Sequence, residues 1–185
     1  MSSPNHPERV VISVVHTSDL EPEVLRAARR VVDLAFAGEF GDDDWDHALG
    51  GVHAVATSDG AVVGHASVVQ RQLVLEGRAH RVGYVEGVGV HPDHQRRGIA
   101  GRLMDRIEHV IRHGYEFGAL GASEAGKPLY QRRGWVPWNG PLGALSPGGL
   151  VDTPEELGTV HVLAGRVAPD VTARLLCDYR EGDLW

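Results

Sequence analysis

The chain has 185 residues, of which 42% are hydrophobic and 23% are charged, as expected for one soluble globular domain spanning residues 1–185. Its formal net charge of −7 disfavours a general nucleic-acid-binding surface, which would be basic. No apolar run has membrane-spanning length, and Cys177 is the only cysteine, so we expect a cytoplasmic protein with no internal disulfide and no membrane partner.

The N-terminal half predicts strands followed by turns, with helices after the first strand. Residues 1–8 carry no signal-peptide pattern, and we expect them to form a mobile tail. A helix is expected from Glu21, capped by Asp19, followed by a short acidic helix at 42–49. β-branched and alternating segments predict strands at residues 9–16, 53–57, 61–75 and 79–90, the last three as antiparallel neighbours.

The C-terminal half alternates helical and extended segments. A proline- and glycine-rich loop is expected at 137–155. Further strands are expected at residues 118–122, 135–138 and 159–163, and a short helix at 127–133. Strands followed by alternating helices and strands indicate a mixed α/β sheet.

Residues 85–101, VEGVGVHPDHQRRGIAG, are the most informative segment. The end of a strand leads through a loop to a helix that opens at residues 95–100. Gly98 lets a ligand approach the backbone closely, and the unpaired N–H groups of a helix N-terminus favour an anion. Arg96 and Arg97 add positive charge to an acidic protein. The segment therefore predicts a pyrophosphate cradle.

The Q/R-x-x-G-x-A pattern at residues 95–100 resembles the acyl-coenzyme A signature of the GNAT N-acetyltransferase superfamily. The resemblance implies an α/β (α+β) fold, with a mixed, mostly antiparallel sheet flanked by helices and acetyl-CoA bound at a splayed strand pair. No Walker or dinucleotide-binding glycine motif is present. The acetyl-CoA-binding residues implied by the resemblance are Val88, Gly89, Val90, Gln95, Arg96, Arg97, Gly98, Ile99, Ala100 and Gly101.

Acetyl transfer to an amine needs a group that accepts the amine proton and a proton for the leaving thiolate. Glu86, on the strand leading to the cradle, could accept the proton or bind the ammonium form of the substrate. The alternative interpretation is that Glu86 is only a surface carboxylate. Tyr130 lies in a Leu-Tyr-x-x-x-Gly-aromatic segment similar to that of the superfamily, which implies the acid role; its alternative is a core tyrosine.

Other chemistries have weaker support. His91 and His94 lack partners at zinc spacing, so they are interpreted as loop residues and no metal is expected. Cys177 follows two leucines, which indicates a buried position rather than a nucleophile. Direct attack in a ternary complex is the simpler hypothesis.

Several segments resemble a narrower family, the aminoglycoside 2'-N-acetyltransferases of actinobacteria. They are FAGEF at 36–40, DWDH at 44–47, GYVEGV at 83–88, LYQRRGWVPW at 129–138 and the terminal CDYREGDLW at 177–185. The resemblance implies acetylation of an aminoglycoside 2'-amine and antibiotic resistance, with Glu86 as base through ordered water and Tyr130 as acid. Membership of the superfamily also suggests a homodimer. The implied substrate-binding residues are Glu39, Asp44, Glu86, Gly87, Glu156, Asp183 and Trp185 through its terminal carboxylate.

Two departures concern the substrate site. Glu39 and Glu156 stand where the family pattern has aspartates, and Gly121 replaces a small hydroxyl residue. Two other functions stay open: a GNAT enzyme for another amine (a cell-wall amino sugar, a polyamine or a protein N-terminus), or a non-catalytic acyl-CoA-binding module. Glu86 and Tyr130 together favour an enzyme.

Overall fold

The computed structural model describes residues 9–185, and the tail expected at residues 1–8 lies outside this range. The strands are β1 (Val10–His16), β2 (Val52–Ser58), β3 (Ala61–Leu75), β4 (Arg78–Val90), β5 (Phe117–Gly121), β6 (Val136–Pro137), β7 (Leu142–Ser146), β8 (Gly149–Asp152), β9 (Val160–Ala164) and β10 (Leu175–Asp178). The helices are α1 (Pro22–Ala35), α2 (Asp42–His47), α3 (Ile99–Gly114) and α4 (Lys127–Arg132). Within residues 9–185, no helix combines the length and apolar character needed to cross a membrane.

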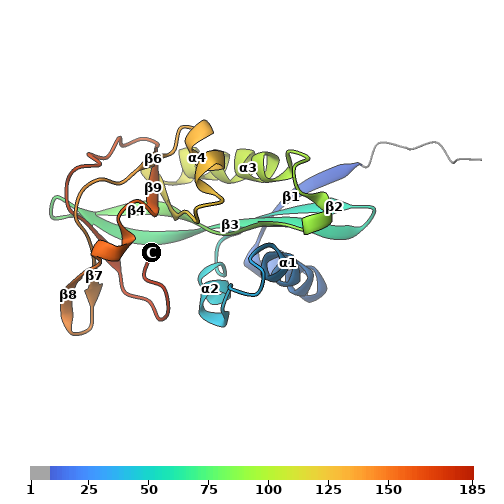
Figure 1. Cartoon of the computed structure of the whole chain (residues 1–185), viewed down its shortest axis with the longest axis horizontal. Helices are drawn as coiled ribbons and strands as arrows, with labels where there is room; N and C mark the ends of the chain where they lie inside the picture. The colour runs from blue at the N-terminus through green and yellow to red at the C-terminus, as the bar shows by residue number, and fades with distance from the viewer. Residues whose placement is uncertain (1–8) are drawn as a thin grey trace, which may run out of the picture.

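The sheet is organised around the two long central strands β3 and β4. Its order is β6-β9-β5-β4-β3-β10-β7-β8, and β1 joins through β2, which also pairs with β3. Helices α3 and α4 cover one face of the sheet, and α1 and α2 cover the other (Figure 1). The expected antiparallel arrangement of β2, β3 and β4 is confirmed.

The C-terminal third differs from the sequence prediction. The prediction of a loop at 137–155 is wrong, because this segment contains the antiparallel hairpin of β7 and β8. Local sequence does not predict this hairpin, because its support comes from strands distant in the chain. β7 pairs in parallel with β10, and β10 in turn pairs with the end of β3. The expected cap of α1 is also wrong, because Asp19 lies in a short 3-10 helix and Glu21 occupies the N-cap position.

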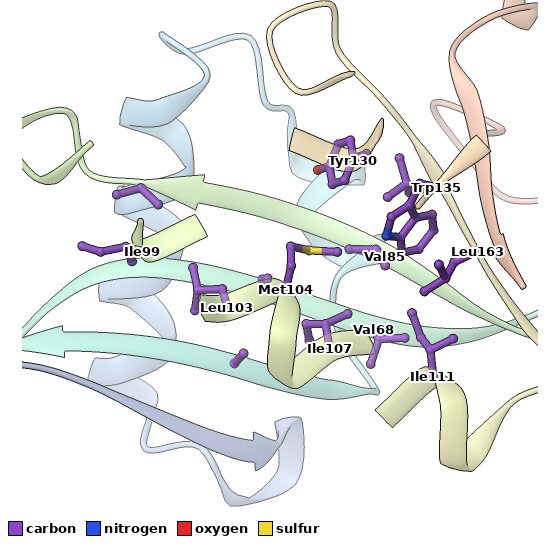
Figure 2. Packing of buried hydrophobic residues seen from close by; sticks show 14 of the residues in the cluster. Val68, Val85, Ile99, Leu103, Met104, Ile107, Ile111, Tyr130, Trp135 and Leu163 are labelled. Atoms are coloured by element: carbon purple, nitrogen blue, oxygen red, sulfur yellow. The ribbon is translucent and has the colours of Figure 1, made fainter. Parts of the chain in front are cut away.

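Helix α3 packs its apolar stripe on the central strands. Ile99, Leu103, Ile107 and Ile111 are buried at helical spacing. Gly64 of β3 permits the close approach, because a Cβ there would lie 3.1 Å from atoms of Ile99 and Leu103. Figure 2 shows Tyr130 and Trp135 in the same cluster, beside the stripe and next to Val85.

A buried carboxylate ties α3 to the segment that carries Tyr130. Glu108 of α3 accepts hydrogen bonds from Trp135 Nε1 at 3.0 Å and from Arg133 Nε at 2.6 Å. Its side chain is 3% exposed, whereas Asp105, which also contacts Arg133, is 63% exposed. The pair with Glu108 is therefore the one shielded from solvent.

This difference in burial predicts unequal costs for removing the two carboxylates. Glu108→Ala is expected to lower the free energy of unfolding by about 3 kcal/mol or more, because it leaves the buried Trp135 N–H without its acceptor and removes the shielded partner of Arg133. Asp105→Ala, the matched control, is expected to cost less than about 1 kcal/mol. Urea denaturation of both variants measures the costs, and equal costs would contradict the assignment.

Candidate active site

The site lies where β4 and β5 separate. The two strands pair in parallel only from Val82 to Tyr84 on β4, opposite residues 117–119 on β5. Beyond that point β4 continues to Val90 without a β5 partner. A cavity of about 520 Å³ occupies this side of the molecule and extends along β4 to the start of α3. The splay thus exposes the second half of β4 to a ligand.

Most of the residues singled out from sequence line this cavity. The lining includes Glu39, Asp44, Glu86, Gly87, Val88, Gly89, Val90, Gln95, Ala100, Tyr130, Asp183 and Trp185. The remaining predicted residues are absent from the lining: Arg96, Arg97, Gly98, Ile99, Gly101 and Glu156. The roles assigned to both sets stay predictions.

Glu86 has a partner that sequence reasoning missed. The Arg180 guanidinium forms an ion pair with Glu86 Oε1, and the side chains of Arg180 and Glu86 are 14% and 12% exposed, respectively. Arg180 also donates through Nε to the Asp183 carbonyl at 2.7 Å and lies over the Tyr84 ring, 5.3 Å from its centroid. Both Arg180 and Asp183 line the cavity. The cavity wall therefore contains its own cation beside the candidate base.

Tyr130 is held at the cavity by α4. Its ring is buried against Trp135, with the ring centroids 6.1 Å apart. Burial, and secondarily the nearby Glu86 carboxylate, raises the pKa of the Tyr130 hydroxyl above its ordinary value of 10.0. The hydroxyl thus carries its proton throughout the physiological pH range, as a proton donor must.

The acidic wall comes from two distant parts of the chain, residues 39–44 and the C-terminal segment. Glu39 follows α1, Asp44 lies on α2, and Asp183 and Trp185 belong to the C-terminal segment. Asp44 also accepts a hydrogen bond from the Gly41 N–H at 2.8 Å, which caps its own helix.

The terminal carboxylate of Trp185 reaches Gly121. A Cβ at Gly121 would lie 3.4 Å from the Trp185 carbonyl carbon and from its oxygen. The Trp185 indole donates to Thr153 Oγ1 at 2.9 Å, and both residues are buried. The position where the family pattern has a hydroxyl residue therefore faces the end of the chain directly.

Arg71 of β3 holds this C-terminal segment in place. Its side chain is 4% exposed and donates to Asp178 Oδ1, to the Asp178 carbonyl and to the Leu184 carbonyl, at 2.8, 2.8 and 2.7 Å. The guanidinium also lies 4.7 Å from the centroid of the Tyr84 ring. These three hydrogen bonds were not apparent from the sequence, where Arg71 is one arginine in an alternating strand.

The helix-opening segment has the geometry of a backbone cradle. Helix α3 begins at Ile99, with Gly98 at the N-cap position in a left-handed conformation. The Arg97 guanidinium donates to the Asp93 carbonyl at 2.8 Å, and Gln95 Nε2 donates to the Val90 carbonyl at 3.1 Å. The Ile99 side chain packs in the core, so only its backbone N–H faces the helix opening.

Glu156 and Cys177 have local partners. Glu156 accepts a hydrogen bond from Thr159 Oγ1 at 2.7 Å. Cys177 is buried, and burial raises the pKa of its thiol, which argues against a thiolate nucleophile. Within residues 9–185, no group of three or more His, Cys, Asp or Glu side chains is arranged to hold a metal ion.

Comparison with known families agrees with the strand splay and the helix opening. Residues 17–137 match the family model described as an acetyltransferase (GNAT) domain. An aminoglycoside 2'-N-acetyltransferase of Mycolicibacterium fortuitum is 47% identical over 177 residues, covering 93% of this chain and 90% of that protein. The chain belongs to the GNAT N-acetyltransferase superfamily and, within it, to the aminoglycoside 2'-N-acetyltransferase family.

Solved structures share the fold. Escherichia coli YhbS, a GNAT family N-acetyltransferase crystallised with CoA, is similar with a TM-score of 0.64 and 19% identity, covering 97% of this chain and 94% of that chain. A GNAT family acetyltransferase from Brucella melitensis in complex with acetyl-CoA has a TM-score of 0.59 and 18% identity, covering 89% and 94%. At these identities the likeness concerns the fold, and the predicted GNAT fold is confirmed.

The hydrogen bonds of Arg71 to the C-terminal segment predict that the cavity wall depends on a residue that does not itself line the cavity. Arg71→Gln is expected to release the C-terminal segment and expose Trp185, because three carbonyl and carboxylate acceptors lose their charged donor. The expected signal is a red shift of tryptophan emission that disappears in a Trp185→Phe background. Arg78→Gln, which removes a largely exposed arginine, is the control. An unshifted spectrum in Arg71→Gln would contradict the prediction.

Proposed function

We propose that this protein transfers the acetyl group of acetyl-CoA to the 2'-amino group of aminoglycosides, by direct attack in a ternary complex. The observation that carries the proposal is a single cavity that combines a half-buried carboxylate, Glu86, with a buried protonated phenol, Tyr130. Antibiotic resistance follows, because an acetylated amine loses the charge with which such a drug binds its target. The 47% identity to a protein named for this activity supports the same assignment.

Acetyl-CoA fits the free side of β4. The cavity runs from Glu86 along Val88 and Val90 to Gln95 and Ala100 at the helix opening, which suits an elongated molecule with a thioester at one end and a pyrophosphate at the other. We assign the pantetheine arm to the unpaired backbone of β4, as an added strand would bind. The pyrophosphate is assigned to the N–H groups at the start of α3. Bound acetyl-CoA supplies the acetyl group as an activated thioester.

A polycationic aminosugar fits the acidic wall. Charge-assisted hydrogen bonds from ammonium groups to Glu39, Asp44, Asp183 and the Trp185 carboxylate would attract and orient it. Glu156 would join only if its loop moved toward the cavity, since its carboxylate contacts Thr159. The wall also explains how an open cavity can select a cation in a chain with a net charge of −7.

The chemical step needs one proton removed and one supplied. The amine nitrogen forms a bond to the acetyl carbon, the carbon–sulfur bond breaks, and the product is an amide plus a thiol. Glu86 accepts the proton from the amine, directly or through water, using the carboxylate oxygen not paired with Arg180. Tyr130 donates its hydroxyl proton to the departing sulfur. Arg180 holds the Glu86 carboxylate in place between substrate and tail.

We further propose that the enzyme acts in the cytoplasm as a homodimer, without nucleic-acid or membrane partners. The buried single cysteine supports the cytoplasmic location, and the acidic net charge disfavours nucleic-acid partners. Apolar side chains exposed on the short strand β8, Leu150 and Val151, support self-association.

Regiochemistry gives the sharpest test of the substrate. Thiol release from acetyl-CoA is expected with an aminoglycoside bearing a 2'-amine and not with its close analogue bearing a 2'-hydroxyl, because an alcohol is a far weaker nucleophile. Release with both compounds would assign another amine. Release with neither, in protein that binds acetyl-CoA, would favour another amine substrate or the non-catalytic acyl-CoA-binding module.

Conservative variants test the two catalytic assignments. Glu86→Gln is expected to lower kcat about 100-fold or more, because the amide cannot accept the amine proton. Tyr130→Phe is expected to lower kcat about 10-fold, since a thiolate leaves without full protonation. Glu181→Gln and Tyr179→Phe are the matched controls. They alter a carboxylate and a phenol of the C-terminal segment that do not line the cavity, so kcat should be unchanged. Full activity in Glu86→Gln would refute the base assignment.

A further inference from the structure

A chain of hydrogen bonds runs from the active-site strand β4 through β3 and β2 to Thr17, which directly follows β1, and the proposed reaction makes no use of it. His65 Nδ1 lies 2.7 Å from the Gly87 carbonyl oxygen, and His65 Nε2 lies 2.8 Å from His53 Nδ1. His53 Nε2 lies 2.7 Å from Thr17 Oγ1, which accepts the Gly50 N–H at 2.9 Å. Both imidazoles are fully buried.

The carbonyl at one end fixes the direction of every bond in the chain. Because the Gly87 carbonyl can only accept, His65 carries its hydrogen on Nδ1 and accepts at Nε2. His53 therefore also carries its hydrogen on Nδ1, and its Nε2 accepts the Thr17 hydroxyl proton, for which it lies closer, at 2.7 Å, than the Gly51 carbonyl at 3.2 Å. Burial lowers the pKa of His53 to about 4 and that of His65 to about 3, so both rings are neutral at pH 7.

The same polarity excludes a proton conduit. A backbone carbonyl at the active-site end neither takes up nor releases a proton under physiological conditions, so nothing can be passed along the chain. What the chain can do is hold the Gly87 carbonyl in one orientation. The ring of Trp45, on α2, packs 5.3 Å from the His65 ring centroid and keeps that imidazole in position.

The orientation matters because Gly87 lies at an irregularity of β4. The register of β3 against β4 shifts between His65 and Ser67, and Gly87 has a left-handed φ of +56°. Ser67 Oγ donates to the Glu86 carbonyl at 3.3 Å, so β3 side chains hold two successive carbonyls here. In a trans peptide the N–H points opposite to the C=O, so the Val88 N–H is directed away from His65. Val88 lines the cavity.

We propose that His65, supported by His53 and Thr17, is a positioning residue for acetyl transfer. By holding the Gly87 carbonyl it aims the Val88 N–H at the oxygen of the reacting acetyl carbonyl and keeps the Glu86 side chain facing the amine. A preorganised donor at a developing oxyanion accelerates such reactions. The inference rests on the proposed function and adds a residue that neither reactant touches.

Two substitutions at position 65 separate positioning from packing. His65→Leu fills the buried space without a donor, whereas His65→Asn places an amide nitrogen near the position of Nδ1 and loses the link to His53. Positioning predicts that Leu lowers kcat about 100-fold, with KM for acetyl-CoA nearly unchanged, and that Asn recovers much of the loss. A packing role predicts the reverse order, because an apolar residue suits a buried site better than an amide. Activity of Leu equal to or above that of Asn overturns the proposal.

A second measurement needs neither turnover nor a variant. Nitrogen chemical shifts of the two imidazoles, recorded on the wild-type protein at pH 7, report which ring nitrogen carries the hydrogen. The proposal requires the Nδ1–H form for His65 and His53, and an Nε2–H form at His65 overturns it. If the wild type released no thiol with any 2'-amine while these shifts were as required, the proposed function would fail and the hydrogen-bond chain would stand.

Discussion

The buried guanidinium of Arg71 is the contact on which the site depends most. It binds the last strand, β10, and the Leu184 carbonyl at once, so the final residues of the chain are pinned across the end of β3. Those residues bring Arg180, Asp183 and the terminal carboxylate to the cavity. Without the hydrogen bonds from Arg71, the acidic C-terminal segment would be repelled by the other carboxylates of the cavity, since like charges at short range are unfavourable even in water.

Strand β4 connects all the remaining parts of the site. Its middle residues, Val82 to Tyr84, pair with β3 on one side and β5 on the other, which gives the second half a rigid base. The second half has lost β5 as a neighbour, so one edge is available for a ligand while the other is held by β3. The left-handed Gly87 occurs at this transition, and the His65 contact keeps the irregular backbone in one conformation. Rigid support beneath an exposed edge is what a preorganised site requires.

Local signals made the cofactor segment predictable, and long-range pairing hid the rest. The strand expected at 79–90, the loop after it and the opening of the next helix at residues 95–100 are each encoded within a few residues, and their positions were predicted closely. The ion pair of Glu86 with Arg180 joins residues 94 positions apart, and Arg71 lies 107 positions from Asp178. The β7–β8 hairpin was mistaken for a loop because its prolines and glycines dominate the pattern, while its support comes from β10.

Arg180 resolves a difficulty that an acidic cavity would otherwise pose. Several carboxylates facing one another repel, and an empty cavity offers them no ammonium groups. Arg180 supplies a cation belonging to the chain itself, paired with Glu86, the carboxylate proposed as the base, and it is anchored through the Asp183 carbonyl and the Tyr84 ring. The more exposed carboxylates, such as Glu39 and Asp183, remain solvated until a substrate arrives. In the function proposed above, binding energy from the substrate's ammonium groups is concentrated at the rim, and the ion pair with Arg180 orients Glu86 before the amine arrives.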